Sequence, residues 1–108
     1  MKANELRIGN WVYFNGNLEN IDLDSFHGIA TYDCFDSYKP IPLTEEWLEK
    51  FGFEEHGNYF EKSIFRVFTT FRGFYLFIGE SYEYGTIDYV HQLQNIYFAL
   101  KDEELTIK

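Results

Sequence analysis

The first forty residues contain a run of β-forming residues at 11–14 and a segment at 18–23 in which apolar and polar residues alternate with the period of two that is typical of β-strands. The run 11–14 is followed by Asn15-Gly16, the dipeptide favoured in two-residue hairpin turns, so we expect a hairpin that returns through residues 18–23. Another strand is expected at 28–32. Together they predict a small curled sheet that ends before the prolines at 40 and 42 and resembles the start of SH3-like barrels in architecture only.

A short helix is predicted directly after the prolines. Thr44 suits the N-cap, acidic residues follow in the first turn, and Lys50 lies in the last turn, where the helix dipole favours a cation. Gly52 stands where a left-handed residue closes a helix, and Phe53 can fold back onto Leu48 as in a Schellman motif.

An antiparallel meander is expected next, with strands at 53–55 and 58–61 and a hairpin over 64–78 that turns at Arg72-Gly73. One face of the hairpin then holds Phe65, Val67, Thr69, Phe71, Phe74, Leu76 and Ile78, and the other holds Ile64, Phe68, Tyr75 and Phe77. A half-exposed sheet would keep its second face polar, so this second face is either covered by the last helix or offered to a partner.

The period changes to that of a helix over residues 89–100, where Val90, Leu93 and Leu100 recur on one side. The other side carries neutral polar residues, which suit either an ordinary exposed helix face or a surface that forms directional hydrogen bonds and is then desolvated. Residues 105–107 suggest a short edge strand. We therefore expect one α+β domain, 1–108, with an N-terminal β lobe (1–39) and a second lobe (43–108) in which the C-terminal amphipathic helix packs on the meander.

The net charge of the chain argues against one class of partner, the nucleic acids. The 108 residues contain 18 Asp and Glu against 9 Lys and Arg, a net charge of −9 that repels phosphate backbones, so direct nucleic-acid binding is not expected. Cys34 is the only cysteine and allows no internal disulfide. No apolar run is longer than that at 74–78, which is too short for a membrane span or a signal peptide, so we expect a cytoplasmic protein.

The sequence offers few candidates for catalytic or metal-binding residues. Metal-ligating residue types gather at Asp22, Asp24, His27, Asp33, Cys34 and Asp36, but their spacing fits neither a calcium loop nor a zinc site. No nucleophile motif surrounds Cys34 or any serine, and no glycine-rich phosphate loop is present. We therefore expect no catalytic residue, metal or cofactor, and we do not expect an enzyme.

Two segments carry a resemblance, namely residues 6–12 (LRIGNWV) and residues 89–100 (YVHQLQNIYFAL). With the helix 42–48 and the following Phe51-Gly52-Phe53, they resemble a group of small uncharacterised proteins of Bacteroidetes bacteria and their prophages. The resemblance covers about a third of the chain. It implies a prophage or mobile-element context and supplies no catalytic residue, cofactor or substrate.

The aromatic content of 21% exceeds what a small core encloses, which indicates that some rings lie at the surface. We therefore expect a non-enzymatic protein-interaction module that binds a host protein. The candidate contact residues are His91, Gln92, Gln94, Asn95, Tyr82, Tyr84, Tyr89 and Tyr97. The alternatives are sequestration of a base or another planar ligand in an aromatic pocket, an acidic mimic of DNA, and pairing with a second copy of the chain.

Overall fold

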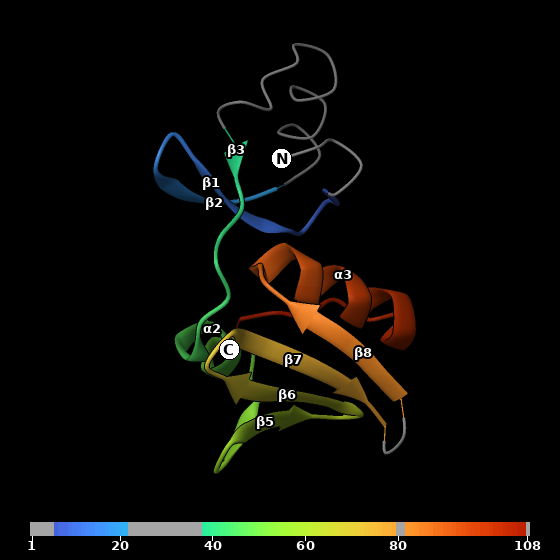
Figure 1. The fold of residues 1–108 in the computed structure, drawn as a ribbon. Coiled ribbons are helices and arrows are strands. Elements are labelled where there is room, and N and C mark those ends of the chain that lie inside the picture. Colours follow the sequence, from blue (N-terminus) through green and yellow to red (C-terminus); the bar gives the residue numbers. More distant parts are fainter. Residues whose placement is uncertain (1–5, 22–37, 80–81, 108) are drawn as a thin grey trace. The chain divides into compact units, whose positions relative to one another are not determined.

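The computed structural model describes residues 6–21, 38–79 and 82–107, and it confirms an α+β fold with a three-stranded sheet, a five-stranded antiparallel sheet and two helices (Figure 1). The chain divides into two compact units. The first comprises Met1–Pro42 with Tyr89–Glu104, and the second comprises Leu43–Asp88 with Leu105–Lys108.

The sheet of the first unit consists of β1 (Trp11–Phe14), β2 (Asn17–Asn20) and β3 (Tyr38–Lys39), in the antiparallel order β2-β1-β3. Asn15 and Gly16 form the turn between β1 and β2, with φ of 50° and 85°. A turn with two left-handed residues matches the twist of the two strands, so the predicted hairpin is confirmed.

The β2 strand ends at Asn20 and is shorter than expected, and the strand expected at 28–32 lies outside the described residues. A small apolar core underlies the sheet. Its buried residues are Leu6, Val12, Ile21 and Tyr38, with Phe14 packed against them.

The helix α3 (Val90–Lys101) confirms the predicted C-terminal helix. The sequence predicts this helix as part of the lobe 43–108, whereas its contacts in the structure place it in the first unit. The backbone N–H of Val90 donates to the carbonyl of Ile41 at 2.9 Å, and Pro42 bridges Tyr89, so the start of α3 is tied to the segment after β3.

In the second unit, α2 (Glu45–Lys50) forms as predicted. The Thr44 hydroxyl accepts from the backbone N–H of Trp47 at 3.3 Å, which is the N-cap bond. At the other end Gly52 has φ of 88°, and Phe53 N–H donates to the Leu48 carbonyl at 3.0 Å. The Schellman closure is therefore present.

The five-stranded sheet is a meander in which every strand pairs antiparallel with the next along the chain (Figure 1). Its strands are β4 (Glu54–His56), β5 (Tyr59–Lys62), β6 (Phe65–Thr70), β7 (Gly73–Ile78) and β8 (Tyr82–Ile87). One face, here called the buried face, carries the fully buried side chains of Phe60, Phe65, Val67, Leu76 and Ile87. Lys62 shares that face and donates to the carbonyl of Phe51, which places the end of α2 on this side of the sheet.

The turn between β6 and β7 differs from the prediction. Thr70 pairs with Gly73, so Phe71 and Arg72 form the turn instead of Arg72 and Gly73. This shifts the pairing register by two residues, and because side chains alternate with a period of two, the strand residues keep the faces that the sequence predicts. The exception is Phe71, which lies at the hairpin tip and is 96% exposed.

The strand β8 was not predicted, and the edge strand predicted at 105–107 does not form. Gly85 interrupts β8 with φ of 124°, next to a bulge where Leu76 pairs with Gly85 but Phe77 pairs with Glu83. A glycine within a strand weakens the sequence signal and often marks a bulge.

Candidate functional site

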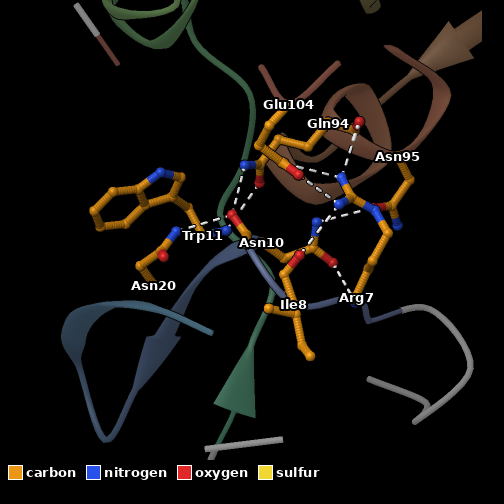
Figure 2. A network of polar contacts seen from close by, with 9 residues as sticks. Arg7, Ile8, Asn10, Trp11, Asn20, Gln94, Asn95 and Glu104 are labelled. Atoms are coloured by element: carbon orange, nitrogen blue, oxygen red, sulfur yellow. Dashed lines mark hydrogen bonds and ion pairs between the residues drawn. The ribbon is translucent and has the colours of Figure 1, made fainter. Parts of the chain in front are cut away.

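A network of polar side chains lies in the first unit. It joins the residues before β1 to α3 and to Glu104, which follows α3 (Figure 2). Its members lie in three stretches, the first of which is more than eighty residues from the other two. They are Arg7 and Asn10, Gln94 and Asn95, and Glu104.

Gln94 is fully buried and uses both ends of its amide. Its Oε1 accepts the backbone N–H of Trp11 at 2.8 Å, and its Nε2 donates to the carbonyl of Gly9 at 2.9 Å. That carbonyl also accepts from Nδ2 of Asn20 at 2.8 Å. The neutral amide of Gln94 accepts at one end and donates at the other, so it satisfies the backbone N–H of Trp11 and the carbonyl of Gly9 without burying a charge.

Asn10 is also fully buried and is bonded through its backbone and its side chain. Its Oδ1 accepts from the N–H of Arg7 at 2.6 Å, and its Nδ2 donates to Oδ1 of Asn95 at 2.8 Å. Its carbonyl accepts from the N–H of Ile21 at 2.8 Å. Asn10 therefore fixes the bend before β1 and links it to α3.

Arg7 adds the charged part of the network (Figure 2). Nη1 and Nη2 donate to the two carboxylate oxygens of Glu104 at 2.6 and 3.0 Å, a planar two-bond pairing that lysine does not reproduce. Nε donates to Asn95 at 3.2 Å, and Nη2 also reaches the carbonyl of Gln94 at 3.3 Å. The guanidinium lies 4.3 Å from the ring centroid of Phe98.

This network explains the neutral polar face of α3. From the sequence, these amides suit either an ordinary exposed helix face or a surface that hydrogen-bonds to a partner and is then desolvated. In the structure the groups that bond Gln94 and Asn95 come from the same chain, in residues 7–11. Residues 7–11 and the helix α3 therefore meet in one hydrogen-bond network.

The eight predicted contact residues fall into three groups. His91, Gln94 and Tyr97 are buried, Gln92, Asn95 and Tyr89 are half-buried, and Tyr82 and Tyr84 are exposed. The rings of Tyr89 and His91 stack at 5.9 Å. The buried side chains of His91, Gln94 and Tyr97 are not available to a partner in this conformation, and a role in binding for the other five candidates stays a prediction.

A row of aromatic rings crosses four strands of the second unit, and we call it the aromatic face. It consists of His56, Tyr59, Phe68, Phe77 and Tyr75, and the register puts these residues opposite the buried face. Successive ring centroids along the row are separated by 5.3, 5.0, 5.2 and 5.3 Å. Aromatic side chains are attracted to one another at these distances, so the row forms one continuous apolar strip.

Three of these residues, Phe68, Tyr75 and Phe77, were predicted to share a face, whereas His56 and Tyr59 were not recognised as part of it. The signal for them was the alternation around Phe60, because Tyr59 and Glu61 must point away from the side that buries Phe60. None of the five is buried.

Charged groups border the aromatic face. Nε of Arg66 donates to Oε2 of Glu61 at 2.8 Å, and its guanidinium carbon lies 6.0 Å from the ring centroid of Tyr59. Nε2 of His56 is 3.7 Å from a carboxylate oxygen of Glu54 and 3.9 Å from one of Glu61.

At the opposite end of the row the hydroxyl of Tyr75 donates a hydrogen bond to the carboxylate of Glu83. This bond, with smaller contributions from desolvation and from the charge of Glu83, raises the pKa of Tyr75 above 10.0. Tyr75 is therefore held as a neutral donor, oriented towards β8.

Metal and membrane sites were also sought. Within residues 6–21, 38–79 and 82–107, no group of three His, Cys, Asp or Glu side chains is arranged to hold a metal ion. The acidic segment with His27 and Cys34 lies outside the described residues. In the same part of the chain, no helix has the length and apolar character needed to cross a membrane.

Comparison with protein-family models, with curated proteins and with solved structures gave no match to this chain. Its function must therefore be argued from its own residues.

Proposed function

We propose that this chain is a non-enzymatic protein-interaction module and that the aromatic face of the meander is its contact surface. The observation that carries the proposal is the continuous strip of five rings on the side of the sheet that faces away from the buried core. A sheet with one solvated face normally places polar residues there, so an aromatic strip on that side requires another explanation.

The chemistry of the strip suits protein recognition. Tyrosine and phenylalanine bury a large area while losing few rotamers, and aromatic residues are enriched among those that contribute most to binding. Hydrogen bonds at its ends orient the polar groups, as Arg66 with Glu61 and Tyr75 with Glu83 illustrate. This arrangement of an apolar centre with a polar rim is the usual anatomy of an interface.

The biological setting is proposed from the resemblance alone. Residues 6–12 and 89–100 resemble proteins of Bacteroidetes and their prophages, so the partner is expected to be a protein of the bacterial host. The proposed role is that of a prophage or mobile-element accessory protein that modulates this host protein.

Affinity capture with a matched pair of variants tests the proposal. The double variant Phe68→Thr/Phe77→Thr removes the middle of the strip but keeps residues that favour strands. Phe71→Thr is the control, because Phe71 is an exposed phenylalanine of the same hairpin outside the strip. Quantitative mass spectrometry of proteins captured from a Bacteroidetes lysate should show a partner that is retained by the wild type and Phe71→Thr and lost by the double variant.

Circular dichroism must show that both variants are folded. If the folded double variant retained the same partner at the wild-type level, the aromatic face would not be the contact surface.

A further inference from the structure

We infer that the aromatic face receives a cationic, arginine-bearing segment of the partner protein. This inference rests on the proposed function and adds the chemistry of the partner. It comes from the charged groups around the strip, which are distinct from the rings that define it.

Carboxylates outnumber cations at the border of the strip. The pairing register assigns Glu54, Glu61 and Glu83 to this side of β4, β5 and β8, and among the strand residues on this side only Arg66 carries a permanent positive charge. The side chain of Glu54 is 82% exposed. A cation that approached the rings would therefore meet a carboxylate at either end of the row.

Arg66 shows how the surface accommodates a guanidinium. Its Nε bonds the carboxylate of Glu61 while the group lies near the ring of Tyr59. Arginine combines these two contacts because its planar group can stack on a ring and donate in its own plane, whereas the ammonium of lysine is a compact and strongly hydrated point charge. An arginine of the partner protein would find the same two contacts here, namely a ring on which to stack and the carboxylate of Glu83 as a hydrogen-bond acceptor.

Other occupants fit the charges less well. A second copy would bring the three carboxylates of Glu54, Glu61 and Glu83 from each chain into one interface, and like charges that are brought together across an interface oppose association. A nucleic acid would bring phosphates to the same carboxylates, in a chain whose net charge is −9.

The test uses three short synthetic peptides in which glycine alternates with arginine, lysine or glutamate. Each is titrated into the isotopically labelled full-length chain while backbone amide NMR shifts are recorded. The arginine peptide should shift amides of β4 to β8 around the aromatic face. The lysine peptide should bind several-fold more weakly, and the glutamate peptide should cause no shift.

Two double variants with the same change in net charge test the position of the carboxylates. Glu54→Gln/Glu83→Gln removes two charges beside the strip and leaves the pair between Arg66 and Glu61 in place. Glu45→Gln/Glu49→Gln removes two charges from α2. The first should weaken arginine-peptide binding by about five- to tenfold at low salt, and the second should change it by less than about twofold.

Three results would overturn the inference. The first is equal weakening by the two double variants, because net charge rather than the aromatic face would then determine binding. The second is that the arginine peptide shifts no backbone amide although capture of the partner still depends on Phe68 and Phe77. In that case the proposed function stands and only the chemistry of the partner is wrong. The third is concentration-dependent shifts of the same amides without peptide, which would identify a second copy as the occupant. Capture that does not depend on Phe68 and Phe77 is the separate result that contradicts the proposed function.

Discussion

Gln94 completes the hydrogen bonding of Trp11, because its side-chain oxygen accepts the backbone N–H of Trp11 at 2.8 Å from a position 83 residues further along the chain. The other end of the same amide holds the carbonyl of Gly9 at 2.9 Å. One buried side chain of α3 therefore forms hydrogen bonds with the backbone at the start of β1. The stability of the first unit should depend on it.

Replacing Gln94 with alanine should lower the free energy of unfolding by about 2–4 kcal/mol, because a buried donor and a buried acceptor lose their partner. Urea unfolding followed by circular dichroism measures the change. The matched control is Gln92→Ala, since Gln92 is a half-buried glutamine of the same helix whose Oε1 accepts the backbone N–H of Tyr89 at 3.1 Å. That variant should lose about 1 kcal/mol or less. Equal losses in the two variants would contradict the role given to Gln94.

Replacing Arg7 with lysine should destabilise the chain almost as much as replacing it with methionine. Lysine keeps the charge, but it cannot form the two-bond contact with Glu104 and at the same time reach Asn95. We expect a loss of about 1–2 kcal/mol for either variant, measured by urea unfolding.

A double-mutant cycle with Glu104→Gln provides the control for this prediction. It should give a coupling energy of about 1 kcal/mol that persists in high salt, since the pair is only a quarter to a third exposed. Full recovery of stability by lysine would show that only the charge of Arg7 matters.

The sequence predicted those parts of the fold that depend on neighbouring residues. The first hairpin follows from the left-handed residues Asn15 and Gly16, and α2 follows from Thr44 and Gly52. The faces of β6 and β7 were correct although the turn was placed wrongly, because a shift of two residues preserves the alternation.

The rest could not be read from local patterns. The neutral face of α3 was recognised as suited to desolvation, but the groups that cover Gln94 lie more than eighty residues away, at Gly9 and Trp11. Nothing in the helix itself distinguishes a partner protein from the chain's own N-terminal segment. The strand β8 was missed for a different reason, since Gly85 and the adjacent bulge break the alternation that identifies strands.

The N-cap of α2 offers a third prediction. Thr44→Ala should lower the free energy of unfolding by about 1 kcal/mol, because the N–H of Trp47 loses the hydroxyl that accepts it. Thr44→Ser is the control, since serine supplies the same oxygen and should stay within about 0.5 kcal/mol of the wild type. Differential scanning calorimetry can compare the three proteins, and a serine variant as unstable as the alanine variant would argue against the cap.

The bond between Tyr75 and Glu83 leads to the last prediction, which concerns pH. Because the folded pKa of Tyr75 is raised above 10.0, chiefly by this hydrogen bond, the interaction stabilises the fold fully below pH 10.0 and is lost as the pH rises through the folded pKa. Replacing Glu83 with glutamine removes the negative charge that favours the neutral phenol, so the pKa of Tyr75 should fall towards 10.0.

Carbon-13 NMR of the tyrosine Cζ atoms, recorded between neutral pH and the end of the titration, follows Tyr75 directly. Glu103→Gln is the control, because burial and, to a smaller extent, the charge of Glu103 raise the pKa of Tyr97, whereas Glu83 and desolvation raise that of Tyr75. If the pKa of Tyr75 were unchanged in Glu83→Gln, the carboxylate of Glu83 would not be the group that raises it. The orientation of Tyr75 at the end of the aromatic face would then depend on the packing of its ring, for example against Phe77.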